Sequence, residues 1–115
     1  MLSTMLKAKI HHARVTESNK EYEGSLLIDP DLMERVKIVP YEKILVANVE
    51  NGKRGETYAI PGERGSRAIG VQGAMAHLAD AGDRVIVFAF AQVPEEDVAS
   101  HKPLILLLDE KNNPK

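Results

Sequence analysis

The chain has 115 residues, of which 43% are hydrophobic and 28% are charged, a composition typical of one small folded domain. It contains no cysteine, which excludes disulfides, a thiol nucleophile and thiolate metal sites. The net charge of −2 and the 4% of aromatic residues argue against a nucleic-acid partner. No apolar stretch approaches the roughly 20 residues of a membrane span, and the start lacks a signal-peptide core. We therefore expect a cytoplasmic protein that binds neither membrane nor nucleic acid.

The first predicted strand covers residues 5–16. Alternation along it places Lys7, Lys9 and His11 on one face, which is most simply interpreted as a face in contact with water. The same alternation predicts that His11 and His12 point to opposite faces. Because the four histidines of the chain share no metal-ligand spacing, no metal site is expected.

A capped helix and a β-hairpin follow in the sequence. Asp29 can cap a helix over residues 30–36, and Pro30 suits its first position. The Asn51-Gly52 pair is the strongest hairpin signal in the chain. The predicted strands in this part are residues 26–28, 43–49 and 54–60, and the polar residues 17–21 are expected to be irregular.

The second half predicts more short strands around one helix. The loop over residues 61–66 contains two glycines and Arg64, and it can be a simple turn between strands or an anion site. A helix is expected over residues 72–81, and a frayed polar tail over residues 109–115. The other predicted elements are strands over residues 67–71, 84–93 and 104–108 and a helical turn from Pro94. Many short strands with few short helices predict a closed or nearly closed β-barrel.

Ser25 is the candidate nucleophile of the chain. It follows Gly24, but the Gly-x-Ser-x-Gly elbow of a hydrolase is absent and no His/Asp partner pattern accompanies it. A serine after a glycine permits another reaction, in which the hydroxyl attacks the preceding carbonyl and the acyl group moves from nitrogen to oxygen. Elimination and hydrolysis then leave a pyruvoyl group at a new N-terminus. Glycine suits the first position because it lacks a Cβ and tolerates unusual backbone conformations.

Short motifs occur in a fixed order along almost the whole chain. They are Lys9-Ile10-His11, Tyr22-Glu23-Gly24-Ser25 with Ile28-Asp29, Asn51-Gly52, Arg54, Thr57-Tyr58-Ala59-Ile60, Gly62-Glu63-Arg64-Gly65-Ser66, Gly73-Ala74, Ala76-His77 and Gly82-Asp83. Each motif is weak alone, but the ordered set, which ends near Leu108, resembles the family of pyruvoyl-dependent aspartate 1-decarboxylases.

The resemblance implies a double-psi β-barrel with a few short helices, in one domain over residues 1–115. It implies self-cleavage between Gly24 and Ser25 into a β chain, residues 1–24, and an α chain, residues 25–115. The expected cofactor is a pyruvoyl group derived from Ser25, with no metal and no pyridoxal phosphate. The expected reaction converts L-aspartate to β-alanine and CO₂ in pantothenate (coenzyme A) biosynthesis, in a homotetramer with active sites between subunits. An accessory maturation factor is an open alternative to spontaneous cleavage.

The resemblance also implies roles for single residues. The pyruvoyl group from Ser25 would form a Schiff base with the substrate amine, and Tyr58 would return a proton to the substrate. Thr57 would hydrogen-bond the Gly24 oxygen during cleavage. The substrate-binding residues would be Lys9, His11, Tyr22, Arg54, Thr57, Gln72, Gly73 and Ala74. Three positions depart from the usual family pattern: Gln72 stands where asparagine is usual, His12 where arginine is common, and Leu26 is bulkier than usual.

Two alternatives remain open from the residues. One is a small β-barrel without catalytic activity, in which Gly24-Ser25 is only a turn and Lys9 and Arg54 bind an anion. The other is a member of the family that folds but is not processed.

Overall fold

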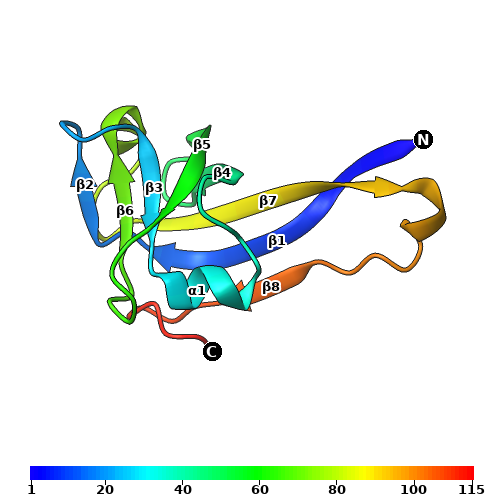
Figure 1. The fold of residues 1–115 in the computed structure, drawn as a ribbon. Coiled ribbons are helices and arrows are strands. Elements are labelled where there is room, and N and C mark those ends of the chain that lie inside the picture. Colours follow the sequence, from blue (N-terminus) through cyan, green and yellow to red (C-terminus); the bar gives the residue numbers. More distant parts are fainter.

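The computed structural model describes residues 1–115 and is built mainly of β-strands (Figure 1). The strands are β1 (Leu2–Arg14), β2 (Glu17–Asn19), β3 (Ser25–Ile28), β4 (Lys43–Asn48), β5 (Arg54–Pro61), β6 (Ile69–Gln72), β7 (Arg84–Pro94) and β8 (Leu104–Leu107). The helices are α1 (Pro30–Arg35) and the short 3₁₀ helices η1 (Gly73–His77) and η2 (Glu95–Asp97). The predicted mainly β fold with a few short helices is confirmed.

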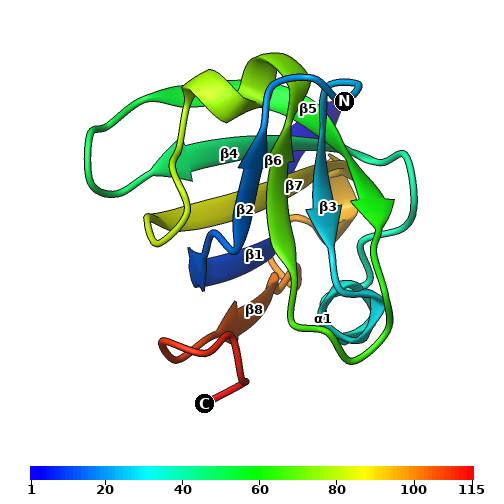
Figure 2. The same cartoon turned by 90° about the vertical axis from the view of Figure 1, so that its left-hand side faces the viewer.

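The eight strands form one sheet that curls on itself. Their order is β2-β6-β3-β5-β4-β7-β1-β8, so β2 and β1 lie near opposite ends although they are consecutive in the chain. Between them, the backbone N–H groups of Val15 and Thr16 donate to the carbonyls of Asp83 and Ile69 at 2.9 and 2.8 Å. In Figure 2, β2, β6 and β3 cross in front of β4, β7 and β1. The sheet is therefore a small β-barrel, as the sequence predicts.

Apolar side chains from most strands meet inside the barrel. Fully buried members of this core include Ile10, Ile28, Ile44, Val46, Ile69, Val71, Val85 and Val87. Helix α1 packs on the core through Leu32 and Met33. Burial of one such side chain stabilises the fold by about 1.5–3 kcal/mol. The predicted helix start is confirmed, since Pro30 is the first helical residue and the Asp29 carboxylate accepts from the N–H of Asp31 at 2.9 Å.

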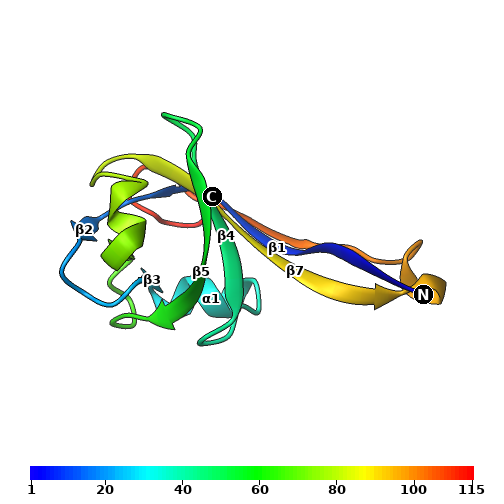
Figure 3. The same cartoon turned by 90° about the horizontal axis from the view of Figure 1, so that it is seen from above.

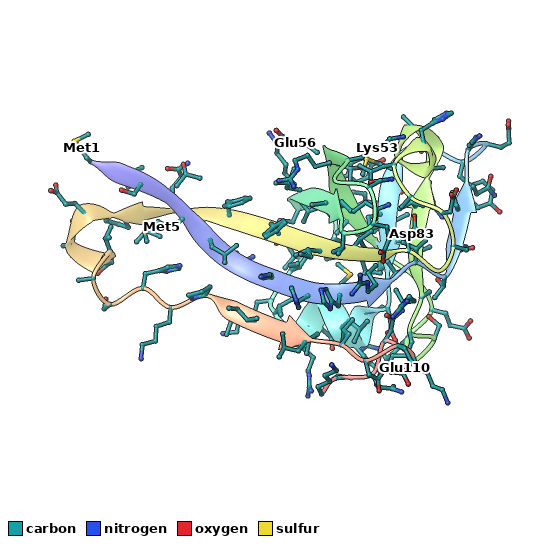
Figure 4. The ribbon with its side chains drawn as sticks, turned by 180° about the vertical axis from the view of Figure 1, so that it is seen from behind. Met1, Met5, Lys53, Glu56, Asp83 and Glu110 are labelled. Carbon is teal, nitrogen blue, oxygen red and sulfur yellow. The ribbon has the colours of Figure 1, made fainter.

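An arm made of the outer halves of β1 and β7 projects from the barrel (Figures 1 and 3). The arm pairs Leu2 with Pro94 and Leu6 with Phe90, and it gives the molecule extents of 43 × 27 × 25 Å. Figure 4 shows Met1 at the tip of the arm, far from Asp83 and Glu110 on the barrel. Leu2 and Phe90 are 62% and 45% exposed, so the arm presents apolar surface to solvent.

Two irregularities in β1 contradict the simple alternation. A register shift between Leu6 and Ala8 places the ammonium of Lys7 2.8 Å from Glu42, so this lysine does not simply face water. A second shift follows Ile10, where His12 has a φ of 59° and its ring stacks on that of His11 at 3.8 Å. The prediction of opposite faces for the two histidines is wrong because the bulge turns them to the same side.

The helix predicted over residues 72–81 is also wrong. Gln72 belongs to β6, and only the 3₁₀ helix η1 follows it. Gly73 has a φ of 64°, a left-handed conformation that prevents a regular helix from starting there. Strand β6 begins at Ile69 because Arg67 is itself left-handed, with a φ of 59°, and residues 17–19 form a strand that the sequence analysis did not predict.

The C-terminal tail is ordered, contrary to the prediction that it frays. Asn112 is 1% exposed, and its side chain accepts from the N–H of Arg14 at 2.6 Å. The same side chain donates to the carbonyls of Arg14 and Arg67 at 2.8 and 2.9 Å. One buried amide therefore ties the tail to β1 and to the start of β6.

The turns agree better with the sequence. Gly52 has a φ of 75° in the turn that joins the antiparallel strands β4 and β5, so the predicted hairpin is confirmed. In the loop over residues 61–66, Arg64 is paired with Asp31 and Glu34 at 2.6 and 2.7 Å. Because the Arg64 guanidinium is already paired with two carboxylates, the structure favours a simple turn over an anion site. None of the helices has the length and apolar character that crossing a membrane requires.

Candidate active site

Ser25 lies at the first position of β3 and is almost fully buried, with 1% of its surface exposed. The antiparallel pairing of β3 with β6 places it directly opposite Gln72. Its hydroxyl donates a hydrogen bond to the Gln72 amide oxygen at 3.0 Å. The candidate nucleophile is thus held on a strand of the barrel rather than on a mobile loop.

A pocket of about 490 Å³ opens beside Ser25, within the range of small-molecule sites. Its lining residues are Tyr22, Glu23, Ser25, Tyr41, Tyr58, Ile60, Pro61 and Gln72. Four of them, Tyr22, Ser25, Tyr58 and Gln72, were predicted as site residues. Tyr41 was not predicted as a site residue, and its ring lies 6.2 Å from that of Tyr58. An aromatic residue directly after Pro40 is the only feature of the sequence that could have indicated it.

Strand β5 brings Tyr58 and Thr57 to the level of the Gly24–Ser25 peptide. The parallel pairing of β3 with β5 sets Leu26 opposite Ala59. Ser25 and Gly24 precede Leu26 as Tyr58 and Thr57 precede Ala59, and Ser25 and Tyr58 line the same pocket. Adjacent residues of a strand point to opposite faces, so Thr57 lies on the face away from the pocket that Tyr58 lines. The Thr57 hydroxyl makes no hydrogen bond within the chain, and its role in cleavage stays a prediction.

Gly73 and Ala74 lie next to the same peptide. A Cβ placed on Gly24 would lie 3.8 Å from the Gln72 carbonyl oxygen and 3.9 Å from the Ala74 nitrogen. The structure thus brings these two predicted residues to the backbone just before Ser25.

Arg54 does not reach the pocket of its own chain. The regular pairing of β4 with β5, from Lys43–Tyr58 to Ala47–Arg54, confirms that Arg54 and Tyr58 share a face of the strand. Their Cα atoms are four residues apart along the strand, about 13 Å at about 3.3 Å per residue. Arg54 is exposed at the far end of β5 and is not paired with a carboxylate.

Lys9 and His11 also lie outside the pocket, on β1. They share the outward face of the strand, as predicted. The residues that alternate with them, Ala8 and Ile10, point inward and are fully buried. The Lys9 ammonium lies 6.0 Å from the centre of the Phe88 ring. In the sheet, β5, β4 and β7 separate β1 from β3.

The surroundings of His11 disfavour the charged form of its imidazole. Burial, followed by the positive charges of His12, Lys9 and Lys115, holds the pKa of His11 below its usual value of 6.5. Its Nδ1 atom is buried and has no hydrogen-bond partner within the chain. The ring therefore retains an unused polar atom beside Lys9.

No three histidine, aspartate or glutamate side chains come close enough together to hold one metal ion. The polar groups that line the pocket are those of a buried serine, three tyrosines, a glutamate and an amide.

Comparison with known proteins finds relatives over the full length of the chain. The sequence model of the family described as aspartate decarboxylase matches residues 1–115. The chain belongs to the aspartate decarboxylase family. The aspartate 1-decarboxylase of Geobacillus sp. (strain WCH70) is 51% identical over 112 residues, 97% of this chain and 88% of that protein. That of Coprothermobacter proteolyticus is 54% identical over 114 residues, 98% of this chain and 92% of that protein.

Membership of the aspartate decarboxylase family indicates which pocket is the candidate active site. Relatives that share about half of their residues with this chain cover nearly all of it, including the segment around Ser25 and both strands beside it. The pocket at Ser25 is accordingly the candidate active site, with Lys9, His11 and Arg54 outside it in the single chain.

Proposed function

We propose that this protein is a pyruvoyl-dependent aspartate 1-decarboxylase that converts L-aspartate to β-alanine and CO₂, a step toward pantothenate. The observation that carries the proposal is the buried Ser25 hydroxyl beside a pocket lined by Tyr22 and Tyr58, in a chain that the aspartate decarboxylase family matches throughout. A small anion-binding barrel would not need a buried serine directly after a glycine beside such a pocket.

The proposed cofactor is a pyruvoyl group formed from Ser25. Cleavage between Gly24 and Ser25 gives a β chain of residues 1–24 and an α chain of residues 25–115. The surroundings fit this group, because Ser25 is buried on a strand and Gly24 lies against the backbone of η1. When formed, the group supplies an electron-withdrawing ketone to which the substrate amine can be joined.

The side chains around Ser25 then bind the substrate and move its proton. Tyr58 lines the pocket at the level of Ser25, and its phenol returns a proton to the substrate carbon that has lost CO₂. Tyr22 and Gln72 line the pocket and hold the substrate, with the backbone of Gly73 and Ala74 next to them.

Substrate carboxylates are bound by Arg54 and Lys9 of a neighbouring copy of the chain, in a homotetramer with its sites between subunits. Arg54 suits this role because its planar guanidinium can hold a carboxylate through two parallel hydrogen bonds. Arg54 does not line the pocket of its own chain, which supports its supply by a neighbouring copy.

Intact mass of the purified protein tests this proposal directly. We expect two fragments, with the α chain one ammonia lighter than a chain that begins with serine, and production of β-alanine from aspartate. The matched control is Ser25→Ala, which lacks the attacking oxygen and is expected to stay uncut and inactive. Cleavage only in a crude lysate would indicate an accessory maturation factor. An active preparation that contains only uncut chain would refute the proposal.

A further inference from the structure

The hydrogen bond between Ser25 and Gln72 uses the hydrogen of the serine hydroxyl and leaves its lone pairs free. A serine hydroxyl has one hydrogen to donate and two lone pairs. Its hydrogen points to the Gln72 amide oxygen at 3.0 Å, and both residues are buried, 1% and 6% exposed. The lone pairs therefore remain free, while the rotation of the side chain is fixed by a bond to the strand directly opposite.

Gly73 makes a second contact with the same segment of chain. Its φ is 64°, and a Cβ added to it would lie 2.5 Å from the nitrogen of Gly24 and 2.6 Å from its Cα. The same Cβ would lie 2.7 Å from the Tyr22 carbonyl oxygen. These are backbone atoms that cannot swing aside as a flexible side chain can. Only glycine lets the backbone before Ser25 pass this close to η1.

We infer that the Gln72 side chain and the Gly73 backbone form a clamp that positions the Gly24–Ser25 peptide for self-cleavage. Gln72 holds the Ser25 hydroxyl after the Gly24–Ser25 peptide bond, and Gly73 contacts the backbone of Gly24 before it. Gln72 acts here as a positioning residue, since an amide oxygen is too weak a base to remove the proton. The inference rests on the self-cleavage proposed above and assigns these two residues a task before any substrate binds.

The reaction that the clamp serves balances without an outside oxidant. The Ser25 oxygen bonds to the Gly24 carbonyl carbon, its proton passes to the Ser25 nitrogen, and the carbon–nitrogen bond breaks to leave an ester. The ester then loses the Ser25 Cα proton and the Cβ–Oγ bond breaks, which releases the Gly24 carboxylate. One water molecule converts the remaining dehydroalanine to the pyruvoyl ketone and ammonia. The first step needs the hydroxyl and the carbonyl held together, which is what the clamp provides.

Two substitutions of Gln72 distinguish the effect of its hydrogen bond on the cleavage rate from the effect of its side-chain shape. Gln72→Met keeps the length of the side chain but removes the acceptor, and we expect cleavage to slow by about tenfold, the factor that corresponds to one ordinary hydrogen bond. Gln72→Glu keeps an acceptor oxygen of the same reach, and we expect it to cleave much faster than Gln72→Met. In this variant the rate should also rise with pH, because an ionised carboxylate accepts the hydroxyl proton better than a protonated one.

The Gly73 contact has a matched control elsewhere in the chain. Gly73→Ala should slow cleavage at least about tenfold, since the added methyl group displaces the backbone of Gly24. Gly52→Ala introduces a side chain at a comparable φ of 75°, where no atom lies within 4 Å, and should cleave as the wild type does. Thermal unfolding of each precursor separates a folded, slow variant from one that fails to fold.

The readout is the rate at which the fragment of residues 25–115 appears by intact mass, independent of decarboxylase activity. Wild-type cleavage with slow Gln72→Met, rescued Gln72→Glu and slow Gly73→Ala supports the clamp. Normal wild-type cleavage together with wild-type rates for both Gln72→Met and Gly73→Ala overturns the clamp and leaves the proposed function intact. Absence of cleavage in the wild type overturns the proposed self-cleavage and the clamp together.

Discussion

Tyr58 is the pocket residue whose substitution separates substrate binding from proton transfer. Tyr58→Phe removes only the phenolic hydroxyl and keeps the ring beside Tyr41. We expect kcat to fall by about 10²–10⁴-fold, the usual contribution of a positioned acid, while substrate capture persists. The measurement combines turnover with the covalent adduct that borohydride traps from aspartate on the processed α chain. Normal turnover would mean that water or another group returns the proton and that Tyr58 only packs.

The residues of the pocket show how far the sequence predicts a site. Tyr22, Ser25, Tyr58 and Gln72 were predicted and do line one pocket. The pairing of β3 with β5 and β6 brings the last three together, and Tyr22 lies just before β3. The sequence could not show that Arg54 lies outside this pocket, because motif spacing states the order of residues and not which copy of the chain supplies them. Tyr41 was missed because it sits in a loop whose path depends on its hydrogen bond to Ala59.

At the scale of elements, Asp29 connects the strand that begins with Ser25 to α1 and to the loop before β6. Burial favours its protonated form, but N–H groups of Asp31, Arg67 and Gly65, together with the Arg67 charge, lower the pKa of Asp29 overall. The carboxylate is fully buried and accepts from Gly65 and Arg67 at 3.0 and 2.7 Å. Its ionised form therefore stabilises the folded state.

Asp29→Asn should lower the free energy of unfolding by about 1–3 kcal/mol at neutral pH, since an amide nitrogen then faces a backbone donor. Because the pKa of Asp29 is lower in the folded state, the stabilisation is present above the unfolded value of 3.8 and is lost as the pH falls through the folded value. Urea unfolding of both proteins, from neutral pH down to about pH 3, measures this difference. A difference that does not shrink at low pH would show that packing, and not the carboxylate charge, accounts for the effect.

Features set by neighbouring residues were predicted well, and most predicted strands are present, but irregularities that depend on how distant segments pair were not predicted. The cap at Asp29 and the turn at Gly52 need only neighbouring residues, and both are confirmed. The bulge at His12 depends on how β1 pairs with β7, which no local pattern of histidines shows. The helix expected after Gln72 fails for a similar reason, because the left-handed Gly73 is required by the chain that crosses it.

At the scale of the whole molecule, the arm and the tail were the least predictable parts. The apolar residues Leu2 and Phe90 of the arm stay exposed in the single chain. The tail is ordered by one buried asparagine that contacts two distant segments. Both features depend on contacts across the full length of the chain, so neither could be predicted from local composition. An exposed apolar arm, together with Arg54 remote from the pocket, is the arrangement expected of a subunit completed by other copies.

Mixing two inactive variants tests that arrangement. Ser25→Ala chains cannot form the cofactor, and Arg54→Ala chains cannot bind the substrate carboxylate, so each alone is expected to be inactive. If one copy supplies Ser25 and its neighbour supplies Arg54, co-expression should restore about a quarter of the wild-type activity, the share of correctly paired sites after random assembly. Light scattering should report about four times the chain mass of 12.7 kDa for wild type and mixture alike. Tetramers that regain no activity would place Arg54 and Ser25 of one chain in the same site, and an active monomer would rule out shared sites altogether.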